Sequence, residues 1–211
     1  MIKLDKRLKA IAGLIAPCET LCDVASDHCK LAIYISQNNL AKTIIASDIS
    51  YKCLKKMQAK CAEQNVKLDL RVADGLQGFA ETHLDVVVIA GLGGREIIHI
   101  LQNNKVAVDK FILVPHQHSI ELREYLSGKF DVNYDHLLQC GKKFYDILVA
   151  EKGCKILTQK QIYFGQNTLD NADFVAYLKQ QKGKLNYVLQ KTNDEKIKNN
   201  ILLELQIMRE L

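Results

Sequence analysis

Short apolar runs separated by longer amphipathic segments are the dominant pattern along this chain. β-Branched and apolar runs of four to eight residues, each followed by a polar residue or a glycine, are typical of buried strands. The clearest is Leu84–Ala90, with the sequence LDVVVIA. By this criterion, strands are predicted over residues 20–24, 43–47, 68–73, 84–90, 111–114, 130–138 and 144–150.

Between these runs, apolar residues recur at helical spacing. Near the start of the chain, Leu4, Leu8, Ile11 and Ile15 give a first helix one apolar face, while lysines and an arginine occupy its outer face. Further helices are predicted over residues 29–37, 51–62, 94–102 and 119–126.

Strand and helix alternate about every 20–25 residues, which predicts right-handed βαβ units and a mostly parallel sheet with helices on both faces. The last two strands are separated only by Cys140–Lys143 and should form an antiparallel pair. Five βα steps closed by a hairpin are the inventory of a class I, Rossmann-like methyltransferase sheet. A dehydrogenase would continue with parallel strands.

The chain changes character after about residue 155, where the strand signals end. Two helical faces follow, the second beginning near Thr192 and Glu195, which have capping-box spacing. We therefore expect an α/β domain over residues 1–152 and a helical, coiled-coil-like hairpin over residues 153–211. The apolar positions on the two faces are Leu169, Phe174, Leu178, Leu185 and Leu189, then Ile197, Ile201, Leu205 and Met208.

Composition supports one sizeable core, because 48% of the 211 residues are hydrophobic and 25% are charged. No stretch approaches the ~18 apolar residues of a membrane span, and the charged start lacks the apolar centre of a secretory signal. We expect a cytoplasmic protein without membrane contact. The seven cysteines form no CxxC pair, which favours reduced thiols and argues against a structural metal site.

Positive charge is concentrated at the C-terminal end. Residues 1–151 hold 19 Lys+Arg and 18 Asp+Glu, a net of +1, whereas residues 152–211 hold 10 and 6, a net of +4. This asymmetry is compatible with a polyanionic partner and equally with a solvated lysine-rich helix.

Nearly every predicted parallel strand ends in a polar or glycine-rich cluster. Because ligands in doubly wound sheets bind beyond the carboxyl ends of the strands, these clusters predict a binding site at that edge. In chain order they are Asp23–His28, Asp48, Asp74 with Gly75, Gly91–Gly94, and Pro115–His118.

The nature of the ligand follows from the residue types. Neither GxGxxG nor GxxxxGK[ST] is present, so no glycine-rich loop is built for a pyrophosphate. Asp48 lies 25 residues after Asp23 and is placed to accept ribose hydroxyls, and Asp74 could accept from an adenine amine. A phosphate-free adenosyl ligand with an amino-acid portion is S-adenosylmethionine. The competing interpretation is that these aspartates only cap helices.

With these motifs in view, the chain resembles the bacterial tRNA (adenine-22, N1)-methyltransferases. The resemblance implies a Rossmann-like catalytic domain, a helical C-terminal hairpin, and methylation of N1 of an adenine in the tRNA D-arm with S-adenosylmethionine. The family usually has Gly where this chain has Ala25, often Glu at Asp48, and commonly Asn at His116. The matching segments are residues 3–8, 23–28, 74–75, 89–94, 114–118 and 141–151.

From the motifs and the resemblance together we assign two groups of residues. Asp27, His28, Gly91 and Gly93 are candidates for positioning the target base and stabilising positive charge on it. Alternatively, Asp27 caps a helix and His28 makes a structural hydrogen bond. The candidate cofactor-binding residues are Arg7, Asp23, Ala25, Ser26, Asp48, Ile49, Asp74, Gly75, Ala90 and Gly91.

The expected partner is tRNA, with a monomer favoured and the oligomeric state left open. Two alternative functions remain at this point. One is a methyltransferase of the same fold acting on another RNA or a small molecule, and the other is an inactive RNA-binding module. The side chains expected to meet phosphates are Lys3, Lys6, Arg7 and Lys9 at the start, and Lys179, Lys182, Lys184 and Lys191 in the hairpin.

Overall fold

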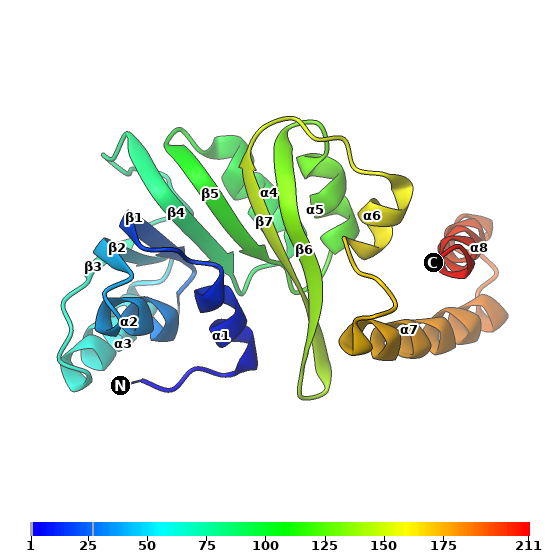
Figure 1. The fold of residues 1–211 in the computed structure, drawn as a ribbon, viewed down its shortest axis with the longest axis horizontal. Coiled ribbons are helices and arrows are strands. Elements are labelled where there is room, and N and C mark those ends of the chain that lie inside the picture. Colours follow the sequence, from blue (N-terminus) through cyan, green and yellow to red (C-terminus); the bar gives the residue numbers. More distant parts are fainter. Residues whose placement is uncertain (1, 27) are drawn as a thin grey trace.

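One seven-stranded sheet runs through the centre of the molecule, in the order β3-β2-β1-β4-β5-β7-β6 (Figure 1). The computed structural model describes residues 2–26 and 28–211. Strands β1 to β5 pair in parallel, and β7 is antiparallel to both β5 and β6. The predicted methyltransferase-type sheet is therefore confirmed. The strands are β1 (Cys18–Val24), β2 (Ala41–Asp48), β3 (Asp69–Val72), β4 (His83–Ala90), β5 (Ala107–Val114), β6 (Phe130–Cys140) and β7 (Lys143–Lys152).

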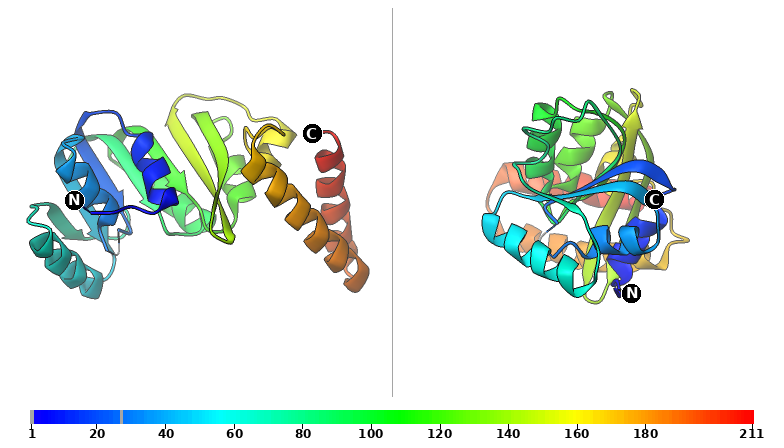
Figure 2. Two further views of the ribbon diagram at one scale, coloured as in Figure 1. Left: turned by 60° about the horizontal axis from the view of Figure 1, so that its bottom comes forward. Right: turned by 90° about the vertical axis from the view of Figure 1, so that its left-hand side faces the viewer.

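Helices cover both faces of this sheet, as the turned views show (Figure 2). Alternate residues of β4 supply the two cores, because successive strand side chains point to opposite faces. Val86 and Val88 pack with α1, α2 and α3, whereas Val87 and Ile89 pack with α4 and α5. The helices are α1 (Lys6–Gly13), α2 (Lys30–Gln37), α3 (Tyr51–Glu63), α4 (Gly94–Asn103), α5 (Ser119–Leu126), α6 (Gln159–Phe164), α7 (Ala172–Lys191) and α8 (Glu195–Arg209).

The first helix is shorter than its apolar spacing predicted. It begins at Lys6 because the Asp5 carboxylate accepts a hydrogen bond from the Leu8 backbone N–H at 2.8 Å and caps the helix. Leu4 and Ile15 lie outside the helix, yet both are buried in the core.

Two details of the C-terminal region differ from the prediction. The N-cap of α8 is Asp194, whose carboxylate accepts from the backbone N–H groups of Lys196 and Ile197; Thr192 accepts from the Asp194 N–H instead. The Asp194 carboxylate, a strongly preferred N-cap group, takes the place of the predicted capping box. Leu169 precedes α7 and is exposed, so it is not part of the helical apolar face.

Helix α6 was not predicted. It has only six residues, too few for an apolar period to show, and a capping box between Thr158 and Gln161 starts it. Its residue Phe164 packs against Phe174 of α7 and Ile207 of α8 in a small cluster of its own. The helix therefore links the sheet to the C-terminal hairpin.

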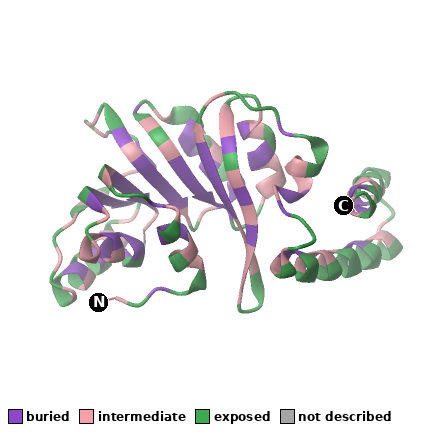
Figure 3. Ribbon diagram, viewed as in Figure 1, coloured by how far each residue is buried: buried purple, intermediate pink, exposed green. Residues whose placement is uncertain are grey.

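The hairpin of α7 and α8 projects beyond the sheet, and its outer surface is exposed (Figures 2 and 3). Three side chains attach it to the edge strand β6. The Asn167 side chain accepts from Leu137 N at 2.9 Å, Asn171 donates to Leu137 O at 3.2 Å, and Asp173 accepts from Gln139 N at 2.9 Å. These contacts satisfy backbone groups that an edge strand would otherwise present to other chains.

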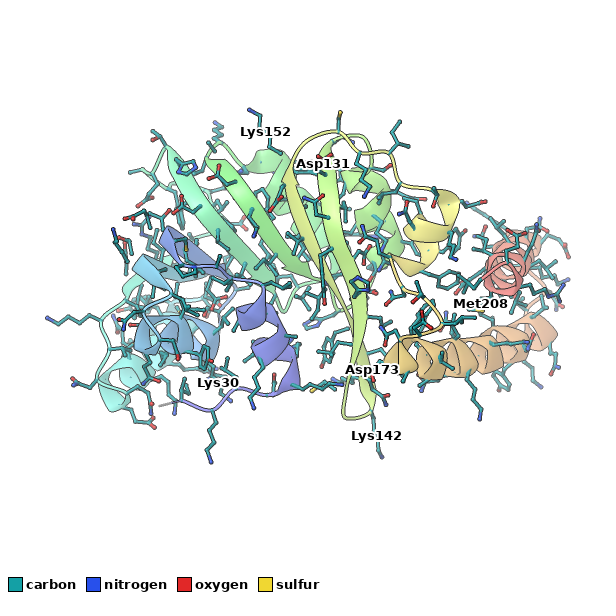
Figure 4. All side chains as sticks on the ribbon, in the orientation of Figure 1. Lys30, Asp131, Lys142, Lys152, Asp173 and Met208 are labelled. Carbon is teal, nitrogen blue, oxygen red and sulfur yellow. The ribbon has the colours of Figure 1, made fainter. Side chains whose placement is uncertain are left out.

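Asp173 also reaches the first helix. Its carboxylate lies 3.0 Å from the Lys6 ammonium, so the start of α7 contacts the start of α1, and Asp173 lies beside the β6–β7 hairpin (Figure 4). Within the described residues, no helix combines the length and the apolar character that crossing a lipid bilayer requires.

Candidate functional site

The first of two adjacent pockets opens at the carboxyl edge of the sheet, between β1, β2 and α4. Its volume is about 430 Å³. Apolar side chains form most of its walls, with carboxylates from the ends of β2 and the β3–β4 loop at the rim. The lining residues are Val24, Ala25, Asp48, Ile49, Ala73, Asp74, Gly75, Leu92, Arg95, Glu96, His99 and Ile100.

Each rim carboxylate of this pocket is fixed by one short local hydrogen bond. Asp48 accepts from the Ser50 backbone N–H at 2.9 Å, and Asp74 accepts from the Gln77 amide at 3.3 Å. Within the described residues, the second oxygen of each carboxylate has no hydrogen-bond partner. The second oxygen of Asp48 and that of Asp74 are therefore available to accept hydrogen bonds from a ligand.

The second pocket, of about 350 Å³, lies between α1, the β1–α2 turn and the end of β4. It is more polar than the first, and Ala25 lines both. The lining residues are Asp5, Arg7, Leu8, Asp23, Ala25, Ser26, His28, Lys30, Leu31, Ala90, Gly91 and His116.

Asp23 is the buried acid of the second pocket, with 5% of its surface exposed. One carboxylate oxygen accepts from the Ser26 hydroxyl at 2.6 Å. Burial raises the pKa of Asp23 to about 6, and the Ser26 hydroxyl and the nearby Arg7 charge limit that rise. The Arg7 guanidinium lies over the Tyr145 ring, 5.1 Å from its centroid, so this side chain is held by packing as well as by charge.

Two turns with left-handed backbone meet where the pockets join. Ala25 has φ +56° and Gly91 has φ +106°. A Cβ at Gly91 would lie 3.9 Å from the Ala25 carbonyl oxygen. The β1–α2 and β4–α4 turns are thus in close approach, which leaves backbone rather than side chains at the junction.

The Gly91–Gly94 turn is held from behind by the loop that follows β5. His116 N donates to Leu92 O at 2.9 Å, and Gly94 N donates to Gln117 O at 2.8 Å. A Cβ at Gly94 would collide with the His118 carbonyl group, so this close packing requires glycine. Gly93 is buried in the same contact and lines neither pocket.

The structure brings nearly all of the predicted site residues to these two pockets. His28 is exposed at the rim of the second pocket. Asp27 lies outside the described residues, and Gly93 packs against the loop after β5 and lines neither pocket. Those that line one pocket or both are Arg7, Asp23, Ala25, Ser26, His28, Asp48, Ile49, Asp74, Gly75, Ala90 and Gly91.

Sequence reasoning missed the contribution of α4. Arg95, Glu96 and His99 lie on its first two turns and form one side of the first pocket. The signal was present, because a helix that follows a glycine turn at the ligand edge directs its first turn toward the ligand. Asp5, Leu8 and the other unassigned residues of the second pocket gave no comparable signal.

Comparisons with known proteins agree with this geometry. A family model described as a methyltransferase domain matches residues 4–148. The tRNA (adenine(22)-N(1))-methyltransferase of Bacillus subtilis is 32% identical over 158 residues, 72% of this chain and 66% of that protein. The chain thus aligns with just under two thirds of the length of this relative.

Two further similarities extend over more of the chain. Protein MG248 of Mycoplasma genitalium, provisionally named a tRNA methyltransferase, is 32% identical over 177 residues, 81% of each chain. The structure of Streptococcus pneumoniae Sp1610, provisionally assigned as a tRNA (m1A22) methyltransferase and solved with S-adenosyl-L-methionine, superposes with a TM-score of 0.86. It is 27% identical, with 99% of both chains covered.

Proposed function

The chain belongs to the family of tRNA (adenine(22)-N(1))-methyltransferases, and we propose that it transfers a methyl group from S-adenosylmethionine to N1 of adenine 22 in tRNA. The observation that carries this proposal is the pair of joined pockets at the carboxyl edge of the sheet. One pocket is apolar with an acidic rim, and the other contains a buried acid and an arginine. Together they match an adenosyl group bonded to an amino acid.

The first pocket fits the adenosyl part of the cofactor. Leu92 and Ile100 provide apolar contact for a flat base, while Asp48 and Asp74 offer unpaired carboxylate oxygens to ribose hydroxyls and the adenine amine. Among the described residues that line this pocket, Arg95 is the one lysine or arginine, and it already pairs with Glu121 at 3.1 Å. These features favour a nucleoside over a nucleotide.

The second pocket fits the amino-acid part. Asp23, ionised above pH of about 6, would hold the ammonium group, and Arg7 would hold the carboxylate. Ala25 stands between the two pockets and has no polar side chain to obstruct a ligand that spans them. Ser26 orients the Asp23 carboxylate through its 2.6 Å hydrogen bond.

Bound S-adenosylmethionine supplies an electrophilic methyl group on a sulfonium. Adenine N1 already carries a lone pair, so the protein needs no strong base and contributes mainly by orientation. Gly91 of the β4–α4 turn and the His28 side chain line the second pocket. Polar groups there would stabilise positive charge that moves onto the adenine ring.

The helical hairpin over residues 153–211 is proposed as the tRNA-binding domain, appended to a catalytic domain over residues 1–152. Its four candidate lysines, Lys179, Lys182, Lys184 and Lys191, are all exposed on α7. Phosphate contacts there would offset the cost of turning the target base out of the folded RNA. We place the reaction in the cytoplasm, where tRNA is found and where the seven free cysteines would stay reduced.

The proposal is tested by incubating the protein and labelled S-adenosylmethionine with two tRNA transcripts, one with adenine 22 and one with guanine at that position. Label should enter only the first transcript, and primer extension should stop at position 22, since N1-methylation blocks base pairing. An Asp48→Ala variant should lose cofactor affinity and rate together. Equal labelling of both transcripts would identify a different RNA position, and cofactor binding without transfer would favour an inactive RNA-binding module.

A further inference from the structure

A third pocket of about 310 Å³ lies between the end of β5 and the C-terminal hairpin. It is built jointly by α5, the β6–β7 pair, α6, α7 and α8. His116 lines both this pocket and the second one, so the two are neighbours. The side chains that give the third pocket its chemistry include Arg123, Phe144, Asp146, Tyr177, Gln181 and Glu204.

Aromatic rings form one wall of the third pocket. Phe144 and Tyr177 meet edge to face with centroids 5.5 Å apart, and Phe174 stacks on Tyr177 at 6.4 Å. Within the described residues, the Tyr177 hydroxyl has no hydrogen-bond partner. The wall therefore combines flat apolar area with one unpaired polar group, which suits a planar ligand that carries polar edges.

Two carboxylates of this pocket, Asp146 and Glu204, can each offer an acceptor oxygen to a ligand. Asp146 accepts from Arg123 through one oxygen at 2.8 Å, and Glu204 accepts from the Gln181 amide through one oxygen at 3.1 Å. The other oxygen of each carboxylate has no partner in the described part of the chain. Arg123 is itself occupied by Asp135 and Asp146, so it offers no charge to a new anion.

Two carboxylates with unpaired oxygens beside a cation that is already paired disfavour a phosphate and favour a neutral ring with N–H donors. We propose that the third pocket receives a second base of the tRNA, a purine with an exocyclic amino group, while the target adenine lies at the entrance to the neighbouring second pocket, whose interior holds the amino-acid part of the cofactor. The amine donates to Glu204, the ring stacks against Phe144 and Tyr177, and the Tyr177 hydroxyl donates to a ring nitrogen. This inference rests on the proposed function and adds a recognition site to it.

Because both parts of the chain build this pocket, base recognition there would couple the hairpin to the reaction site. The hairpin would then recognise one base in addition to binding the phosphate backbone of the tRNA. Phosphates would contact the exposed lysines of α7, outside the pocket, and the base would enter it. The Asp173–Lys6 and Asn167–Leu137 contacts attach α7 and the segment before it to α1 and β6.

Two conservative substitutions test the pocket without disturbing its shape. Tyr177→Phe removes only an unpartnered hydroxyl, and Glu204→Gln keeps an oxygen for Gln181 while removing the charge. Each should raise the KM for tRNA roughly fivefold, the loss of about one hydrogen bond. The kcat and the cofactor Kd from calorimetry should stay within about twofold of the wild type, because neither residue lines the first two pockets.

Matched controls are Tyr187→Phe and Glu210→Gln, which change an exposed residue of α7 and the exposed C-terminal cap of α8. Both should retain the wild-type KM. Thermal melts of all four variants measure their stability, so that a change in KM can be distinguished from unfolding. Test variants that behave like the controls would overturn the inference.

A second experiment identifies the base that enters the third pocket. Inosine lacks the exocyclic amine of both adenosine and guanosine, so tRNAs are assembled with a single inosine at each D-arm purine other than position 22. One of these inosine-containing tRNAs should raise the KM of the wild-type protein about as much as Glu204→Gln does. The same tRNA should cause no further rise in KM in the Glu204→Gln variant. Purely additive effects at every position would refute the pocket assignment. Absence of wild-type methylation would instead refute the proposed function.

Discussion

The Arg123 guanidinium donates to both carboxylate oxygens of Asp135, at 2.7 Å from Nε and 2.8 Å from Nη2. Both side chains are almost fully buried, with 2% and 1% of their surfaces exposed. Nη2 also donates to Asp146 at 2.8 Å, and Nη1 donates to the Tyr163 carbonyl at 3.4 Å. One cation thus ties α5, β6, β7 and α6 together beneath the third pocket.

Removal of this cation should be strongly destabilising. Arg123→Ala leaves two carboxylates without their partner in the interior, and we expect the free energy of unfolding to fall by about 3–5 kcal/mol. Urea denaturation followed by circular dichroism measures the change. Arg95→Ala is the control, because its pair with Glu121 is exposed and should contribute less than about 1 kcal/mol. Equal losses in the two variants would contradict the assigned role.

Replacing Ala25 with glycine should stabilise the folded protein. Its φ of +56° lies in the left-handed region, where a side chain costs about 1–2 kcal/mol relative to glycine. Part of that gain is offset by the greater freedom of glycine in the unfolded chain. Ala25→Gly should therefore raise the free energy of unfolding by up to about 1 kcal/mol, measured by urea denaturation. A lower stability would show that this turn tolerates its side chain without strain.

Gly94 should not tolerate even one methyl group. A Cβ there collides with the His118 carbonyl, which is backbone and cannot move aside cheaply. Gly94→Ala should separate the β4–α4 turn from the loop after β5 and reduce methyl transfer at least about tenfold, measured with saturating cofactor.

Gly183 provides the matched control for this substitution. It lies inside α7 with open space around its Cβ position. Gly183→Ala should stabilise the helix by about 0.5–1 kcal/mol and leave the rate unchanged. Normal activity in Gly94→Ala would mean that the turn relaxes without consequence.

Cofactor affinity should depend on the protonation of Asp23. Burial raises the pKa of this carboxyl to about 6, so it is ionised at pH 7.5 and becomes protonated below about pH 6. The charged form is the one that attracts an ammonium group. The Kd for S-adenosylmethionine should therefore rise as pH falls, approaching about tenfold per pH unit below 6.

Calorimetric titrations between pH 5 and 8 measure this dependence. Asp23→Asn should bind the cofactor weakly with a nearly flat pH profile, because its amide does not titrate in this range. A wild-type profile as flat as that of the variant would remove Asp23 from contact with the ammonium group.

Several properties followed from local sequence pattern alone. Apolar runs such as Leu84–Ala90 specify buried strands, and their alternation with helices leaves few topologies open. Asp48 and Asp74 were located for a related reason, since the carboxyl ends of parallel strands must meet at one edge. The sheet type and the ligand edge were thus determined by short-range periodicity combined with a chiral connection rule, and the ends of the strands located Asp48 and Asp74.

Tertiary packing decided what no local pattern encodes. Arg123 belongs to an ordinary amphipathic helix in the sequence, and only the meeting of β6 and β7 with α5 turns it into a buried cation. The third pocket likewise exists only where Phe144 and Tyr177, 33 positions apart in the printed sequence, face each other. Contacts between distant segments depend on how whole elements pack, and periodicity within one element carries no information about its neighbours.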